Sequence, residues 1–354
     1  MTRRSWLFGA MMLMGAGCSQ QDTDVPPIGP GTGAGFPTFP TFTGAPSTGT
    51  PTGTSTGSTT VDLCEFPPPA PAVWTELPNI PNSEEFAFSD SGTVLNIDDS
   101  ANLLYESGFS GAPTIVAPYN SAEVGAVRFL ADGSALVIAD EGNGSLVKMT
   151  LDGNTSVLLG SIPEPNSIAI HSDGWVYTTA ADQIWKVDPV SGQAAMQFTL
   201  PGTDLDGLVL NVDESFLFFN HDEDGVVGRA QVQPNGDLVS PTVIGNIIQG
   251  FAELDGMAVD ECNNIYVVIT DGRVIRFRPS GAYETYVDLG AGGAFTTSLH
   301  FGSGLGGFKT DHLYVMDRFG AVIEVDVGLH GRGEPHLPPF PTSGGSTTGT
   351  TGTP

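Results

Sequence analysis

The sequence is poor in positive charge. Lys and Arg together number 12 against 40 Asp and Glu, which gives a formal net charge of −28. A protein that binds nucleic acid presents clustered Lys and Arg to the phosphates, so this composition excludes a nucleic-acid partner. The acidity fits a soluble surface domain and is also compatible with bound divalent cations, but solubility alone is the simpler explanation.

Long apolar runs are also missing. The apolar stretch from Trp6 to Met14 follows Arg3 and Arg4 and precedes small residues and Cys18. At about nine residues it is too short to span a bilayer. This segment resembles a bacterial lipoprotein signal, in which the Cys is lipidated, although Gly15 stands where such signals usually carry Leu. We therefore predict a lipoprotein-type signal peptide over residues 1–18, with lipidation at Cys18.

An ordinary cleaved signal is the alternative, and it too exports the protein. The expected location is the outer membrane or cell surface, as a lipoprotein, and otherwise the periplasm or the medium. Contact with a membrane is expected only through the lipid anchor.

Cysteine is scarce, with three residues in the chain and no Cys-x-x-Cys spacing. This excludes the usual metal and redox motifs built on that spacing. If Cys18 carries lipid, Cys64 and Cys262 remain, in a compartment where disulfides persist. We predict a disulfide between them that ties the entry segment to the domain; two buried free thiols are the alternative.

Apolar side chains are rare at both ends of the chain. Pro, Gly, Ser and Thr dominate residues 19–63 and residues 337–354. Such segments bury too little apolar surface to offset the entropy lost on ordering. We predict a flexible linker over residues 19–63, a folded domain over residues 64–336 and a disordered tail over residues 337–354.

The folded part is rich in turns and repeats itself. Residues 254–281 alternate short β-rich runs with Asp-Gly and Pro-Ser-Gly turns, which is typical of antiparallel strands joined by hairpins. Similar phrases begin near residues 83, 125, 165, 205 and 297. A period of about 40 to 50 residues with four strands per unit is typical of a β-propeller. We predict an all-β, six-bladed, monomeric propeller with disordered N- and C-terminal tails.

Polar residues recur just before the innermost strand of several units: Glu84, Asn166, Asp206 and Asp255. In a propeller these strands line a central channel, and their starts meet at one mouth. Converging carboxylate and amide oxygens are the ligands that Ca²⁺ prefers. The alternative is ordinary turn chemistry, because Asp and Asn side chains also bond to their own backbone in turns.

Two segments resemble the regucalcin/gluconolactonase family. They are LDGMAVDECNNIYVVITDGRVIRFRPSG (residues 254–281) and residues 296–335 with their closing Val-Asp-Val-Gly phrase. Members of that family are six-bladed propellers, often lactone hydrolases with one divalent metal. The resemblance extends over roughly residues 80–336, and related propellers share parts of the same phrase.

The resemblance implies roles for individual residues. Asp255 falls on the family's metal-binding Asp, which is also its proposed general base. Glu84 falls near a metal-binding Glu, with Glu85 an equally close candidate. Asp206 stands where the family has a metal-binding Asn, and Asn166 falls on an Asn that contacts substrate or metal.

One departure from the family concerns sugar recognition, since Glu164 occupies the place of a substrate-contacting Arg. A site with Glu84, Asp206 and Asp255 also carries three carboxylates, which could hold a cation tightly or, without one, share a proton. The expected cofactor is one divalent cation, with Ca²⁺ preferred to Zn²⁺.

The resulting hypothesis is a metal-dependent lactone hydrolase, in which the cation polarises the carbonyl and Asp255 takes a proton from water. A Ser nucleophile motif and metal-type His spacing are absent, and His300 is interpreted as a hydrogen-bonded core residue. The alternatives are a non-catalytic propeller that binds a protein, peptide or glycan, and a structural or secreted sensor.

Overall fold

The computed structural model describes residues 63–65, 67–69, 71, 73–201, 204–222, 224–247 and 253–340. The predicted signal peptide, the lipidation site Cys18, nearly all of the linker and residues 341–354 lie outside this part of the chain.

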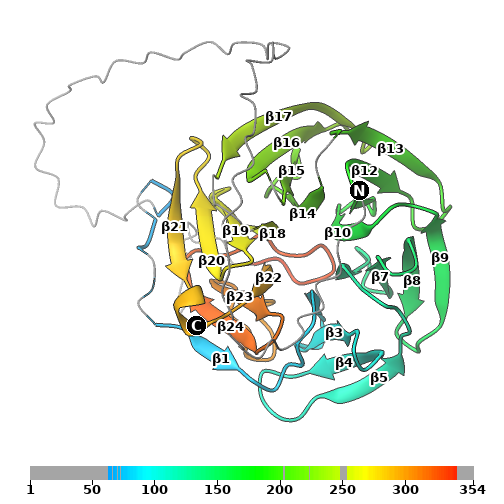
Figure 1. Cartoon of the computed structure of the whole chain (residues 1–354), viewed down its shortest axis with the longest axis horizontal. Helices are drawn as coiled ribbons and strands as arrows, with labels where there is room; N and C mark the ends of the chain where they lie inside the picture. Colours follow the sequence, from blue (N-terminus) through cyan, green and yellow to red (C-terminus); the bar gives the residue numbers. More distant parts are fainter. Residues whose placement is uncertain are drawn as a thin grey trace, which may run out of the picture. The chain divides into compact units, whose positions relative to one another are not determined.

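Within the described residues the chain forms six four-stranded antiparallel sheets, arranged around a common centre, and one short 3₁₀ helix, η1 (Gly290–Gly292) (Figure 1). The predicted all-β, six-bladed propeller is therefore confirmed. The strands of the first three blades, from the centre outward, are β2 (Phe86–Phe88), β3 (Val94–Asp98), β4 (Leu103–Ser107) and β5 (Thr114–Pro118); β6 (Ala126–Phe129), β7 (Ala135–Asp140), β8 (Ser145–Thr150) and β9 (Thr155–Gly160); and β10 (Pro165–Ile170), β11 (Val176–Ala180), β12 (Gln183–Val187) and β13 (Ala194–Thr199).

The strands of the other three blades, in the same order, are β14 (Leu205–Leu210), β15 (Phe216–His221), β16 (Val226–Val232) and β17 (Leu238–Asn246); β18 (Leu254–Val259), β19 (Ile265–Ile269), β20 (Arg273–Phe277) and β21 (Tyr283–Asp288); and β22 (Thr296–Phe301), β23 (His312–Asp317), β24 (Val322–Asp326) and β1 (Thr75–Leu77).

Burial falls from the centre of each blade to its edge. Every residue of β10 and β11 is buried, whereas most of β9, an outer strand, is exposed. The hairpins between the first two strands of a blade use the expected turns, and Gly174 adopts a φ of 93° that a residue with a side chain rarely takes. The inner strands of neighbouring blades pack on each other, so the core runs around the ring.

An N-terminal strand closes the ring. β1 pairs antiparallel with β24, with Thr75 opposite Glu324, and completes the sixth blade at its outer edge. The chain before β1 is also attached to blade five, because Arg276 donates a hydrogen bond from Nη1 to the Pro68 carbonyl (3.1 Å). First and last segments of the domain are thereby joined in one sheet, which protects the edge strand.

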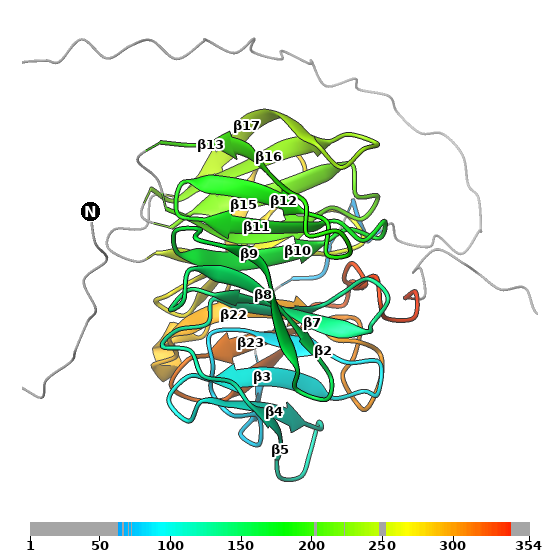
Figure 2. The same cartoon turned by 90° about the vertical axis from the view of Figure 1, so that its right-hand side faces the viewer.

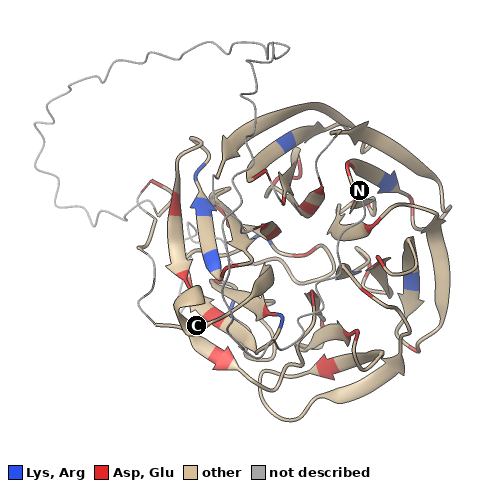
Figure 3. Cartoon of the chain, viewed as in Figure 1, with Lys and Arg blue, Asp and Glu red and all other residues tan. Residues whose placement is uncertain are grey.

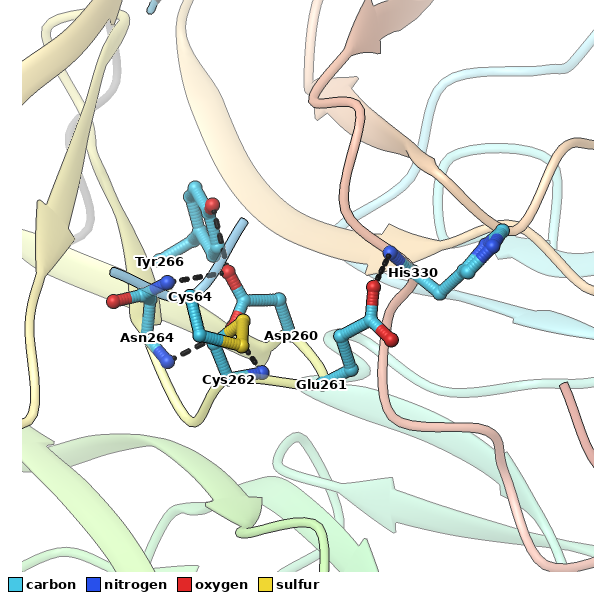
Figure 4. The surroundings of a disulfide bond; sticks show 7 residues. All are labelled: Cys64, Asp260, Glu261, Cys262, Asn264, Tyr266 and His330. Atoms are coloured by element: carbon cyan, nitrogen blue, oxygen red, sulfur yellow. Dashed lines mark hydrogen bonds between the residues drawn. A yellow bond between two sulfur atoms is a disulfide. The ribbon is translucent and has the colours of Figure 1, made fainter. Parts of the chain in front are cut away.

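A disulfide joins Cys64 to Cys262, the pairing expected from the sequence (Figure 4). Cys262 lies in the turn between β18 and β19, where buried Asp260 accepts hydrogen bonds from the Cys262 backbone (2.9 Å), the Asn264 side chain (2.8 Å) and the Tyr266 hydroxyl (3.0 Å). The entry segment is thus bonded to a turn that is itself firmly held.

The C-terminal segment after β24 crosses the centre of the ring on one face (Figures 1 and 2). Arg332 donates from its backbone N–H to the Val259 carbonyl (2.8 Å), and His336 lies 2.8 Å from the Phe88 carbonyl. Both carbonyls stand where inner strands end, so this segment covers the mouth opposite the predicted site. Leu337, placed in the tail by the sequence analysis, is only 7% exposed and packs in the core.

In the described part of the chain, no helix has the length and apolar character needed to cross a membrane.

Candidate functional site

The predicted acidic residues of blades four and five lie in β-bulges. The register shifts between Leu205 and Leu208 in β14, and the same shift occurs at the start of β18, so Asp206 and Asp255 lie within strands. The prediction that Asp255 and Gly256 form a turn before the strand is therefore wrong. A bulge holds two residues against one on the partner strand, which re-aims the side chains there.

Two further inner strands shift register at the same place. In β10 the shift spans Asn166, and in β22 it falls at Thr297, which the sequence analysis did not single out. Thr297 donates a hydrogen bond from Oγ1 to the Glu84 carbonyl (2.7 Å), which joins blades six and one. Glu84 lies two residues before the short inner strand β2. All of these positions stand at the mouth where the inner strands begin.

The structure brings three of the predicted residues within electrostatic range. Burial raises the pKa of Asp255 well above its usual value, and the negative charges of Asp206 and then Glu84 raise it further. Asp206 is 6% exposed and Asp255 8%. Figure 3 shows acidic positions coloured red on the inner strands β14 and β18, which lie near the centre of the ring. Asn166 is also buried at this mouth, on blade three.

Arg318 is the residue of this mouth that sequence reasoning missed. It follows β23 in the turn to β24, and its guanidinium forms an ion pair with Glu84 and lies 3.7 Å from Glu123. Burial raises the pKa of Glu84 to about 7, although the charge of Arg318 opposes that shift. Arg318 lies in the turn of a hairpin and not at the start of an inner strand, so the pattern of polar residues at strand starts does not include it.

Other groups complete the rim. Asp99 follows β3, and burial raises its pKa to about 6. Next to Arg318, the ring of Phe319 is 75% exposed and packs on Phe295, with ring centroids 5.4 Å apart. The mouth therefore combines several carboxylates, one guanidinium and an exposed aromatic surface.

Glu85, the second candidate for the metal-binding Glu, has a different environment. It accepts a hydrogen bond from Arg128 Nη2 (2.8 Å) and lies 2.6 Å from His300 Nε2. Burial would raise the pKa of Glu85, but Arg128 and His300 outweigh it and lower the pKa to about 2. Glu85 is thus held in an ion pair inside the channel, and His300 is hydrogen-bonded, as the sequence analysis expected.

A small cavity lies among the inner strands beside the C-terminal segment. This cavity of about 30 Å³, lined by Arg128, His300, Arg332 and Glu334 among others, has room for roughly one water molecule. The C-terminal segment thus covers the far mouth, and the acidic residues lie at the mouth where the inner strands begin.

The donor set does not fit a resident divalent cation as it stands. Among the described residues, no three acidic, His or Cys side chains are arranged to hold a metal ion. Glu84, one of the expected ligands, is engaged by the guanidinium of Arg318. The cation expected from the sequence therefore stays a prediction.

The bulged strands with Asp206 and Asp255 lie within the part of the chain that resembles a known family. Residues 203–317 match the family model described as SMP-30/Gluconolactonase/LRE-like region. This match includes blades four and five and the two inner strands of blade six, but neither Glu84 nor Arg318. No curated protein matches the sequence.

Solved structures show the same fold in proteins with different activities. A gluconolactonase from Xanthomonas campestris is 14% identical, covers 74% of this chain and 95% of its own, and has a TM-score of 0.60. An auxiliary nutrient binding protein from Bacteroides thetaiotaomicron is 10% identical, with coverage of 69% and 68% and a TM-score of 0.58. A virginiamycin B lyase from Staphylococcus aureus is 18% identical, with coverage of 69% and 81% and a TM-score of 0.53. At these identities the likeness concerns the fold alone.

Proposed function

We propose that the protein is a hydrolase that opens a small lactone at the acidic mouth, with Asp255 as the general base. The observation that carries this proposal is the buried carboxyl of Asp255, whose pKa is raised by burial and by the charges of Asp206 and Glu84, within electrostatic range of the cationic Arg318. The family match over residues 203–317 supports the choice of a lactone as substrate.

In this mechanism Asp255 removes a proton from a water molecule as the water oxygen attacks the lactone carbonyl carbon. Negative charge develops on the carbonyl oxygen, and the guanidinium of Arg318, which is always charged, stabilises it. When the ring C–O bond breaks, the ring oxygen takes the proton back from Asp255, and the product is a hydroxy acid. A divalent cation enters none of these steps.

The test is a panel of five- and six-membered lactones, followed with a pH indicator. Asp255→Asn should lower kcat by about 10²- to 10⁴-fold while the melting temperature stays close to that of the wild type. Asp213→Asn, at an exposed turn position between β14 and β15, is the matched control and should leave the rate unchanged. Absence of turnover on every lactone would overturn the hydrolase proposal.

Binding without catalysis is the second candidate function, and the exposed Phe319–Phe295 pair favours it. Aromatic faces at the rim of a polar site suit ring-shaped ligands such as sugars. Calorimetry with mono- and oligosaccharides separates the two candidates. Heat of binding that disappears in Phe319→Ala, without turnover, would favour a glycan-binding propeller.

We also propose that the protein is exported and anchored through Cys18. The Cys64–Cys262 disulfide supports export, since such bonds persist in oxidising compartments. Metabolic labelling with a fatty acid should mark the wild-type chain and not Cys18→Ser. An unlabelled wild-type chain would leave the ordinary cleaved signal as the explanation.

A further inference from the structure

The acidic mouth contains a positively charged side chain, the guanidinium of Arg318. We propose that the guanidinium of Arg318 is the resident cation of this mouth, in the place of a metal ion, and that divalent cations bind tightly only when this charge is removed. The inference concerns the site of the proposed hydrolase but goes beyond that function, because it holds whether or not a lactone is hydrolysed.

Several carboxylates surround the guanidinium of Arg318. Its guanidinium pairs with Glu84 and lies 3.7 Å from Glu123. Asp255 and Asp99 also act on its charge. Four carboxylates from blades one, two and five thus share one positive group that comes from blade six. Only 33% of the Arg318 side chain is exposed, so solvent screens these interactions only in part.

Hydrogen bonds hold the backbone of Arg318 in place. Its N–H donates to the Phe295 carbonyl (2.9 Å), and its own carbonyl accepts from Asn82 Nδ2 (2.9 Å). The preceding residue, Asp317, accepts hydrogen bonds at Oδ1 from the backbone of Phe295 (3.1 Å) and of Phe319 (3.2 Å). The fold therefore fixes the point from which the Arg318 side chain extends to the carboxylates.

The fixed charge of the guanidinium also opposes a metal ion at this mouth. A guanidinium keeps its charge at every pH at which the protein is folded, so it cannot make way for a metal ion by losing a proton. A divalent cation at the same carboxylates would lie beside a fixed positive charge and would lose Glu84 as an available ligand. Arg318 therefore offsets part of the negative charge of the mouth and opposes the binding of Ca²⁺ at the same time.

The experiment is calorimetric titration of the full chain with CaCl₂ at fixed pH and ionic strength. Arg318→Gln removes the charge but keeps a side chain of similar polarity, and it should bind Ca²⁺ at least about tenfold more tightly than the wild type. Arg318→Lys keeps the charge and should resemble the wild type. Arg278→Gln, which breaks an exposed ion pair with Glu284 on blade five, removes the same charge elsewhere and should leave Ca²⁺ affinity unchanged.

A second measurement covers the case in which Arg318→Gln folds poorly. The melting temperature of that variant should rise with CaCl₂, the wild type should not respond, and addition of Asp255→Asn to Arg318→Gln should abolish the response. Equal Ca²⁺ affinity in wild type and Arg318→Gln, including no binding in either, would overturn the proposal, as would an equal gain in Arg278→Gln. The lactone assay is read separately, so failure of the hydrolase proposal leaves these outcomes intact.

Discussion

Two glycines allow neighbouring inner strands to approach each other beside the acidic residues of the mouth, because glycine has no side chain. A Cβ added at Gly207, next to Asp206, would lie 2.6 Å from both the Asp255 carbonyl and the side chain of Met257. One added at Gly256 would lie 2.7 Å from the backbone of Ser298. Neighbouring inner strands therefore approach each other closely beside the two aspartates, which explains why Asp is followed by Gly at both bulges.

Gly207→Ala should accordingly destabilise the protein. The contact is with backbone, which cannot move aside cheaply, so we expect a loss of about 1–3 kcal/mol in the free energy of unfolding. Gly292→Ala is the matched control, because a Cβ there meets nothing within 4 Å. Urea unfolding measures both variants. Equal stability of the two would mean that the close approach of β14 and β18 is not a constraint.

The ion pair of Glu85 with Arg128 allows a second prediction for single residues. Both side chains are at least nine-tenths buried, so Arg128→Met leaves a carboxylate buried without its main partner. We expect a loss of about 3–5 kcal/mol, which adding Glu85→Gln should partly restore. Arg278→Met, which breaks the exposed ion pair Arg278–Glu284, should lower the free energy of unfolding by less than about 1 kcal/mol. Denaturant unfolding of the wild type and these three variants gives the comparison, and similar losses at both sites would contradict it.

At the scale of whole elements, the strands were predictable because their sequence is periodic. Alternating β-branched and aromatic residues between Asp-Gly turns predicted hairpins such as β18 to β20, and six such units predicted the ring. The bulges in β14 and β18 were not predictable, because a bulge is defined by pairing with a partner strand and Asp-Gly is equally common in turns. Arg318 was not predictable for the same reason, because its position depends on residues far away in sequence. Asn82, which donates a hydrogen bond to the Arg318 carbonyl, is 236 residues away.

The charges around Glu334 in the C-terminal segment predict how the stability of the protein depends on pH. Burial raises the pKa of Glu334, but Arg332, Arg128, His300 and His336 together outweigh it and lower that pKa below the usual value. A carboxyl with a lowered pKa in the folded state stabilises the protein above the pKa of the unfolded chain. That contribution disappears as the pH falls through the folded-state pKa.

Glu334→Gln should therefore be less stable than the wild type at pH 7, and the difference should shrink between pH 5 and pH 3. Denaturant unfolding of both proteins at several pH values measures this difference directly. A gap that stays constant down to pH 3 would show that Glu334 acts through its shape and hydrogen bonds and not through its charge.

For the molecule as a whole, closure of the ring depends on a short strand and one covalent bond. β1 contributes only Thr75–Leu77 to the sixth blade, and the first two of these residues are exposed. The Cys64–Cys262 bond spans 198 residues of sequence, so it removes much conformational freedom from the unfolded chain. It also keeps the segment before β1 beside blade five, where Arg276 holds the Pro68 carbonyl.

Replacing both cysteines by Ser should therefore cost about 2–5 kcal/mol of stability and lower the melting temperature. A reductant should lower the melting temperature of the wild type toward that of the double variant and leave the variant itself unaffected. Limited proteolysis should then cut the segment between Cys64 and β1 faster, because β1 separates from β24 more often once the bond is gone. An unchanged melting temperature and an unchanged rate of cleavage would mean that the pairing of β1 with β24 closes the ring without help from the disulfide.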